Sequence, residues 1–202
     1  MTGKIPPEFW DSLQLQLLDV SSNQLVGEIP KRLGGLHSLF NLNLSRNNLT
    51  GQIPIEIGNL FNLETLDLSG NYLTGISPLT LGNCLKLMLI NLSRNELKGS
   101  IPFSLATLRF LEKVDLSCNS LTGAIPPELG SLSMLTTMNL SHNNLSGIIP
   151  SYFGSMLSLS SIDLSFNNLE GPIQKAPTEW LSTTKIYVAL CQVFLLALHY
   201  QK

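Results

Sequence analysis

An asparagine returns at a constant interval along most of this chain, and no other feature restricts the fold as strongly. A serine precedes each of these asparagines by two residues, a leucine follows two residues later, and a glycine follows four residues later. The spacing holds without a slip from residue 3 to residue 173. Self-similarity with a period of roughly 20–50 residues is typical of stacked repeats. The seven asparagines, called here the ladder asparagines, are Asn23, Asn47, Asn71, Asn95, Asn119, Asn143 and Asn167.

Seven positions in each repeat are apolar, and over seven repeats only Ser12 and Ser77 break this rule. Around Ile90 and Leu92 the apolar residues alternate with polar ones, which predicts a short strand. Elsewhere they are spaced by three, which suits short 3₁₀ helices, and Gly and Pro at fixed offsets end each segment. A single repeat unit cannot bury seven apolar side chains alone, so the repeats must stack into a solenoid.

The ladder asparagines are predicted to be structural rather than ligand contacts. Where the chain turns inward after each strand, backbone groups would be left unpaired in the interior, at a cost of roughly 1–3 kcal/mol each. An asparagine amide supplies two donors and an acceptor, so stacked asparagines are able to bond the backbone of their own and the adjacent coil.

Composition and charge exclude several function classes. The 202 residues include 12 Lys and Arg against 14 Asp and Glu, without a basic cluster, which argues against nucleic-acid binding. The three cysteines have no zinc-ligand spacing and the three histidines lie far apart, so neither a metal site nor a cofactor is predicted. Asp115, Ser141 and His142 superficially resemble a catalytic triad, but nothing supplies an oxyanion hole, and no catalytic residue is predicted.

Three segments, LDLSGNYLTG at 66–75, NLSRNELKGSIP at 91–102 and NLSHNNLSGIIP at 139–150, resemble the plant-specific leucine-rich repeat, LxxLxLxxNxLxGxIPxxLGxLxx. The resemblance extends from residue 3 to about residue 174. It looks most like the extracellular, membrane-proximal repeats of plant receptor-like kinases of the male-discoverer-interacting type. It implies an α/β repeat solenoid, a right-handed arc with a concave parallel β-sheet and with 3₁₀ turns or short strands on the convex side.

The chain is predicted to have three parts. Residues 1–174 form the solenoid, with a partial repeat, seven full repeats and none of the Cys-paired caps of the family; 175–185 form a polar linker and 186–200 a short apolar helix. The apolar segment falls short of the roughly 20 residues that span a bilayer as a helix. Three interpretations of 186–200 stay open: a buried or interfacial helix, a truncated membrane segment, or residues that are out of frame or derived from an intron.

Two features of the family are not found in the sequence. Met1 is followed directly by the middle of a repeat, with no signal peptide before it, and no kinase motif follows the repeats. The sequence is therefore expected to be a fragment of an extracellular repeat domain that lacks the kinase domain. The resemblance implies that the parent protein lies in the plasma membrane, with its repeats on the extracellular face.

Ligand contacts are expected on the concave face, where strand side chains point away from the core. A mixed cluster in the middle of the sheet suits an extended peptide, through charge-assisted hydrogen bonds and one apolar contact. The open alternative is a solvated face with internal ion pairs, on which the alternating Asp and Asn residues tie neighbouring strands together. The candidate residues are Glu64, Asp67, Met88, Arg94, Glu112, Lys113, Asp115 and His142.

Asn48 and Asn144 begin N-x-S/T motifs just after a ladder asparagine and are candidate glycosylation sites on an outward turn. Two function classes stay open. One is an interaction module that binds a secreted peptide or the leucine-rich repeat ectodomain of a co-receptor. The other is a structural or truncated fragment with no ligand site of its own. Membrane association is an option only through residues 186–200.

Overall fold

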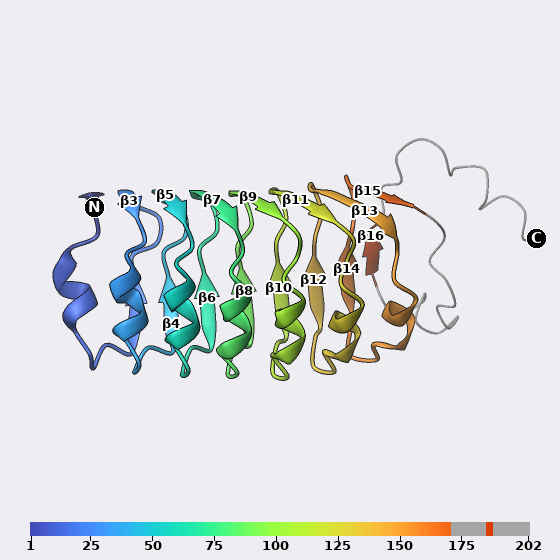
Figure 1. The fold of residues 1–202 in the computed structure, drawn as a ribbon, viewed down its shortest axis with the longest axis horizontal. Helices are drawn as coiled ribbons and strands as arrows, with labels where there is room; N and C mark the ends of the chain where they lie inside the picture. The colour runs from blue at the N-terminus through green and yellow to red at the C-terminus, as the bar shows by residue number, and fades with distance from the viewer. Residues whose placement is uncertain (171–184, 188–202) are drawn as a thin grey trace, which may run out of the picture.

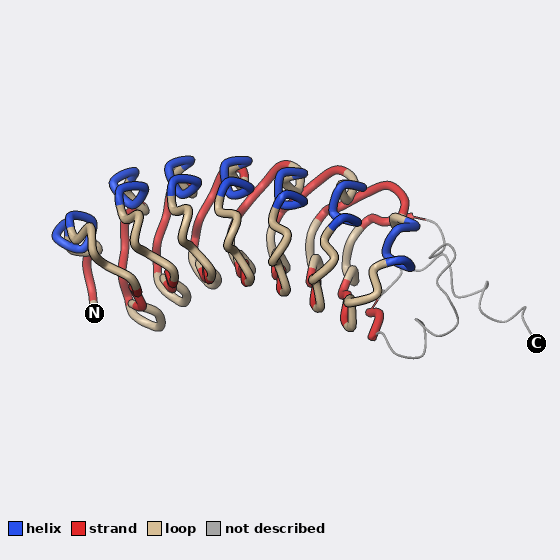
Figure 2. The backbone as a smooth tube through the Cα atoms, turned by 90° about the horizontal axis from the view of Figure 1, so that it is seen from below, coloured by secondary structure: helices blue, strands red, loops and turns tan. Residues whose placement is uncertain are grey.

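The chain winds into a curved row of similar coils, each of which contributes strands to two parallel sheets and one 3₁₀ helix (Figure 1). The computed structural model describes residues 1–170 and 185–187. One sheet lines the inner, concave side of the arc, and the 3₁₀ helices lie on the outer, convex side (Figure 2). The repeat solenoid predicted from the sequence is confirmed.

The concave sheet consists of three-residue strands, and from β2 to β14 the central residue of each strand is buried while the outer two are less buried or exposed. Neighbouring strands pair in parallel with an offset of one full repeat, so that Lys113 lies beside Thr137 and Val114 beside Met138. Equivalent positions of successive repeats therefore form straight columns across the sheet. In spatial order the strands are β2 (Leu17–Asp19), β4 (Asn41–Asn43), β6 (Thr65–Asp67), β8 (Leu89–Asn91), β10 (Lys113–Asp115), β12 (Thr137–Asn139), β14 (Ser161–Asp163) and β16 (Lys185–Tyr187).

The second sheet begins just after each ladder asparagine, and its strands pair with an offset slightly shorter than one repeat, as Val26 does with Asn48. The repeated glycine in these strands has a positive φ, from 75° at Gly99 to 91° at Gly27, in a region that side chains with a Cβ rarely adopt. In spatial order the strands are β1 (Thr2–Gly3), β3 (Gln24–Glu28), β5 (Asn48–Gln52), β7 (Tyr72–Ile76), β9 (Glu96–Gly99), β11 (Ser120–Gly123), β13 (Asn144–Ile148) and β15 (Asn168–Glu170).

Each 3₁₀ helix begins directly after a proline or with one, since the ring fixes φ and ends the preceding strand; Pro54, for example, has φ −67° and ψ 139°. The helices are η1 (Pro7–Asp11), η2 (Lys31–Gly35), η3 (Ile55–Asn59), η4 (Leu79–Asn83), η5 (Phe103–Thr107), η6 (Pro127–Ser131) and η7 (Ser151–Ser155).

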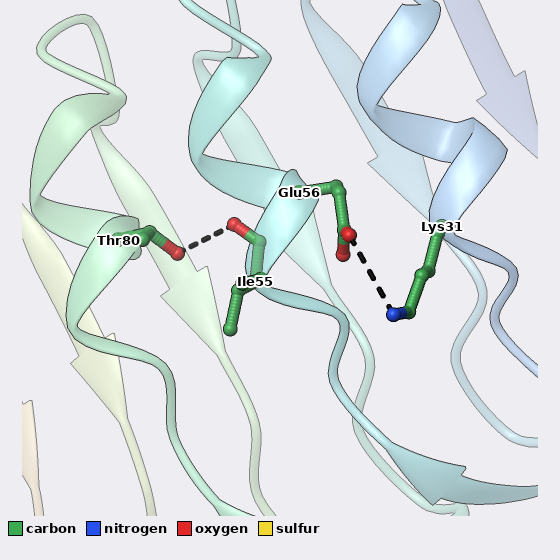
Figure 3. Close-up of polar contacts among 4 residues, drawn as sticks. All are labelled: Lys31, Ile55, Glu56 and Thr80. Atoms are coloured by element: carbon green, nitrogen blue, oxygen red, sulfur yellow. Dashed lines mark hydrogen bonds and ion pairs between the residues drawn. The ribbon is translucent and has the colours of Figure 1, made fainter.

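Neighbouring 3₁₀ helices pack closely because small residues separate them. A Cβ added to Gly58 would lie 2.5 Å from the carbonyl oxygen of Thr80, which is closer than real contacts allow. Side chains then link the coils: the Thr80 hydroxyl donates to the carbonyl oxygen of Ile55 at 2.6 Å, and Lys31 Nζ lies 4.0 Å from Glu56 Oε1 (Figure 3). The convex side is therefore a tightly spaced row of helices.

A single apolar core runs through the coils from Ile5 to Leu164. Most of its leucines have no exposed surface, which is the burial that stacking of the repeats requires. The two polar exceptions differ: Ser12 is exposed, whereas Ser77 is buried and its hydroxyl has no hydrogen-bond partner within residues 1–170.

The C-terminal segment differs from the prediction where the structure describes it. Ile186 and Tyr187, expected to begin a helix, belong instead to β16, which also takes Lys185 from the predicted linker. β16 pairs with β14 at the same one-repeat offset, with Ile186 beside Ile162. Residues 171–184 and 188–202, with the rest of the linker and helix predictions, lie outside the described residues. In the described part of the chain, no helix has the length and apolar character needed to cross a membrane.

Candidate functional site

The ladder asparagines fix the backbone at the end of each concave strand. Asn47 accepts a hydrogen bond from the backbone N–H of Leu25 at 2.9 Å, and its Nδ2 donates to the carbonyl oxygens of Val20, Leu44 and Ser45 at 3.0–3.2 Å. The amide thus bonds its own coil and the preceding one, and Asn47 is only 5% exposed. Side chains that flank this turn are therefore held on a rigid support.

The residue directly before each ladder asparagine adopts a left-handed conformation. The φ angles are 54–55° for the six non-glycine residues and 63° for Gly70. Six such residues at one repeated turn are unusual, since this region is disfavoured for side chains with a Cβ. The turn therefore keeps its shape while the side chain changes along the column, which consists of Ser22, Arg46, Gly70, Arg94, Cys118, His142 and Phe166.

Three of the candidate residues, Glu64, Met88 and Glu112, lie side by side just before the concave strands. The backbone N–H of Met88 donates to the Glu64 carbonyl at 2.9 Å, and that of Glu112 donates to the Met88 carbonyl at 2.8 Å. Lys113 is the first residue of β10 and is exposed. Met88 is 38% exposed, so its thioether offers an apolar contact between the two carboxylates.

Asp67 and Asp115 are already engaged within the fold. Asp67 Oδ1 accepts hydrogen bonds from the backbone N–H and the hydroxyl of Ser69 at 2.9 and 2.6 Å, and Oδ2 accepts from Asn91 Nδ2 at 3.4 Å. Asp115 Oδ1 accepts from Ser117 in the same way, at 2.9 and 2.7 Å. Their Oδ1 atoms hold the turn after the strand, and this leaves less of each carboxylate for a ligand.

Asp19, at the equivalent position of an earlier strand, shows the electrostatic effect of this turn. Asp19 Oδ1 accepts a hydrogen bond from the backbone N–H of Ser21 at 2.9 Å, and Asn43 Nδ2 donates to Asp19 Oδ2 at 3.2 Å. The bond from Ser21 stabilises the carboxylate and lowers the pKa of Asp19 below its ordinary value. A negative charge at the end of the strand is therefore compatible with the fold.

Arg94, Lys113 and His142 make no ion pair within residues 1–170. The ion pairs found there lie elsewhere, between Lys31 and Glu56 and between Arg32 and Asp11. The alternative in which internal ion pairs occupy the concave charges is therefore absent from this part of the chain. The charged groups of Arg94 and Lys113 are therefore free to bind groups from outside.

His142 has an aromatic partner that was not among the predicted site residues. Its ring stacks on that of Phe166, with the centroids 4.1 Å apart and the planes at 14°. Phe166 is 60% exposed and follows His142 by one repeat, in the same column as Arg94. That spacing is the sequence signal that would have found it. The pair forms an exposed aromatic surface at the C-terminal end of the column.

The candidate glycosylation sites lie in the second sheet rather than on the concave face. Asn48 begins β5 and Asn144 begins β13, and both are exposed. Asn168 Nδ2 donates to Asn144 Oδ1 within the same column. Groups attached to Asn48 or Asn144 would leave the concave sheet open.

Comparison with family models identifies the class of this repeat solenoid. A leucine rich repeat model matches residues 61–121 and 109–169, and a second leucine rich repeat model matches 14–36 and 38–60. The chain belongs to the leucine-rich repeat family. No curated protein matches it.

Solved structures of plant proteins are similar to this chain over most of its length. The ectodomain of the receptor kinase GASSHO1/SCHENGEN3 from Arabidopsis thaliana, in complex with CASPARIAN STRIP INTEGRITY FACTOR 2, is 40% identical with a TM-score of 0.86, covering 92% of this chain and 22% of that chain. The Arabidopsis receptor kinase HAESA, in complex with the peptide hormone IDA and the co-receptor SERK1, is 35% identical with a TM-score of 0.83, covering 95% and 33%. A plant ice-binding protein is 38% identical with a TM-score of 0.74, covering 77% and 51%.

The similarity covers most of this chain but only part of each receptor chain. The present chain spans only 22% and 33% of the two receptor chains, so it corresponds to a part of such an ectodomain. Both receptor structures contain a bound partner, which in the HAESA complex includes a peptide hormone. The fold shared with them is that of a leucine-rich repeat ectodomain.

Proposed function

We propose that this chain is a peptide-binding module from the extracellular domain of a plant receptor-like kinase of the male-discoverer-interacting type. Its concave face binds a secreted peptide, and it acts by binding rather than by catalysis. Among the receptors that it resembles, HAESA is in complex with the peptide hormone IDA, and the peptide hormone receptor RGFR1 is in complex with RGF2. A second partner is the leucine-rich repeat ectodomain of a co-receptor, as the HAESA complex contains.

One observation carries the proposal: the concave face presents charged side chains that the fold does not neutralise. Arg94 lies at the turn before a ladder asparagine and Lys113 begins β10, and neither makes an ion pair within residues 1–170. Charged groups that are unpaired on a rigid support are suited to charge-assisted hydrogen bonds with a ligand, which are stronger than neutral ones.

The arrangement favours a peptide with groups of both signs. Glu64 and Glu112 lie just before β6 and β10, whereas Arg94 lies after β8, the strand between them. An extended chain that crosses these strands would have the two carboxylates along one side and the Arg94 guanidinium along the other. Met88, between the two glutamates, would contact an apolar side chain of the peptide.

The experiment uses the full chain immobilised on beads and a pool of peptides from plant apoplastic fluid, with mass spectrometry of the bound fraction. We expect enrichment of defined peptides, reduced at least about tenfold by the double substitution Arg94→Gln and Lys113→Gln, since each lost charge-assisted bond costs roughly 1.5–3 kcal/mol. Lys31→Gln on the convex side is the matched control. Failure to enrich any peptide, or equal enrichment by the variant, would favour a structural fragment without a ligand site.

The proposal also locates the protein. A module of this kind acts on the extracellular face of the plasma membrane, where Asn48 and Asn144 are accessible for glycosylation. Both lie in the second sheet, so glycans there are compatible with a ligand on the concave sheet.

A further inference from the structure

A row of small residues packs the convex helices together, and it is interrupted at one place. The row consists of Gly34, Gly58, Gly82, Ala106, Gly130 and Gly154. A Cβ at Gly34, Gly58 or Gly82 would lie 2.5–2.7 Å from a carbonyl oxygen of the next coil. Ala106 carries such a Cβ, so η5 and η6 cannot approach as closely as neighbouring helices do from η2 to η5.

A groove with a volume of about 790 Å³ opens at this junction. Ala106 and Ser131, from η5 and η6, line it together with Leu85, Arg109, Phe110 and Ser133 from the loops that follow the helices. These loops form the lower edge of the solenoid in Figure 1 and connect each 3₁₀ helix to the concave strand that follows it. Its size lies within the range of ligand-binding clefts, roughly 300–1,000 Å³.

The groove lies within a longer exposed apolar ridge on the same flank. Leu85 and Phe110, which line the groove, are 56% and 55% exposed. An exposed apolar surface of this kind marks an interaction site more often than isolated apolar residues do. The exposed apolar residues of the ridge are Leu13, Phe61, Leu85, Phe110, Met134 and Leu157.

The charge of the groove is one-sided. Arg109 makes no ion pair within residues 1–170, and no Asp or Glu from these residues lines the groove. Lys86 lies on the same flank, and its Nζ donates to Asn62 Oδ1 at 2.8 Å rather than to a carboxylate. A ligand that complements this surface therefore carries a negatively charged group.

From this geometry we propose a second binding site on the lateral flank, between the fifth and sixth 3₁₀ helices. Its ligand is a segment of a partner protein that presents an aromatic or aliphatic side chain next to a carboxylate. The apolar side chain lies against Leu85 and Phe110, and the carboxylate binds the Arg109 guanidinium, which matches carboxylates through two parallel bonds. This site is independent of the concave face and of the peptide proposed to bind there.

The test titrates the ¹⁵N-labelled full chain with two short synthetic peptides, acetyl-Ser-Phe-Asp-Ser-amide and acetyl-Ser-Phe-Asn-Ser-amide, and follows the backbone amide signals by NMR. We expect signals of Ala106, Thr107 and Ser131 to shift with the Asp peptide, and the Asn peptide to require about tenfold more for half-saturation. Equal half-saturation by the two peptides, or shifts confined to the concave strands, would overturn the proposal.

Two variants distinguish specific binding in the groove from non-specific binding elsewhere on the surface. Arg109→Gln should remove the preference for the Asp peptide, whereas Lys98→Gln, an exposed cation in β9, should leave it unchanged. Ala106→Gly restores the residue found elsewhere in the row and should let the helices close, so both peptides should lose the shifts at Ser131. An unaltered preference in Arg109→Gln, or unaltered binding by Ala106→Gly, would contradict the proposed site.

Discussion

The interior and the concave surface of this solenoid are built from adjacent residues, yet they differ in what is repeated. Every ladder asparagine from Asn47 to Asn167 accepts one backbone hydrogen bond and donates to three carbonyl oxygens in the same pattern. The residue directly before it changes from Arg46 to Gly70 to Arg94 with almost the same φ. A column that repeats reports the fold, whereas a column that varies on a fixed backbone is available for binding.

The largest effect on stability is expected from a substitution in the column of ladder asparagines. Asn47→Ala leaves the backbone N–H of Leu25 and three carbonyl oxygens without their partner in the interior, so the free energy of unfolding should fall by about 3 kcal/mol. The adjacent Asn48→Ala, at an exposed position, should change it by less than about 0.5 kcal/mol. Urea unfolding followed by circular dichroism measures both. A similar loss of unfolding free energy in the two variants would show that the buried ladder asparagine is no more important to stability than its exposed neighbour.

The repeated columns are also the part that the sequence predicts well. The coils, the parallel concave sheet and the 3₁₀ helices follow from the constant repeat spacing, because each coil must bury the same face against the next. The prediction of a helix from residue 186 is wrong for Ile186 and Tyr187, because apolar composition alone does not distinguish a helix from a buried strand. Ile186 lies one repeat after Ile162 and continues the sheet.

The surface columns are predicted less well, because their contacts depend on neighbours in the adjacent repeats. Asp67 and Asp115 have the same carboxylates as Glu64, but a serine two residues later engages them. That serine is visible in the sequence as a turn signal. The groove beside Ala106 could not be predicted from a comparable sequence signal. Alanine differs from the glycines of the row by a single methyl group, and its effect on helix spacing is seen only in the stacked coils.

The next effect concerns Cys84, which replaces leucine in a core column. Burial raises the pKa of its thiol from the ordinary 9.0 to about 11. Because the folded pKa lies above the unfolded one, the stabilisation is complete below pH 9 and is lost as the pH rises through 11. The free energy of unfolding should therefore fall by about 2 kcal/mol between these pH values.

The variant Cys84→Leu supplies the control, since leucine occupies the same position at Leu60 and Leu108. Its unfolding free energy should fall less over the same pH range. Tyr152, whose pKa burial also raises, is present in both proteins and does not affect the difference. Equal slopes in the two proteins would show that the thiol does not titrate on unfolding.

The smallest effect comes from the one buried position within residues 1–170 where the repeated column fails. Ser77 is 5% exposed, and its hydroxyl has no hydrogen-bond partner in this part of the chain. The adjacent Ile76 is 64% exposed. The position equivalent to Ser77 in the next coil is the buried Ile101. Ser77→Ile should raise the free energy of unfolding by about 1 kcal/mol, because apolar burial outweighs the cost of fitting a larger side chain. Ser77→Ala, which only removes the hydroxyl, should stabilise by a few tenths of a kcal/mol. Thermal unfolding measures both. If Ser77→Ala destabilises the chain, the Ser77 hydroxyl makes a stabilising hydrogen bond, and serine at this position does not weaken the core.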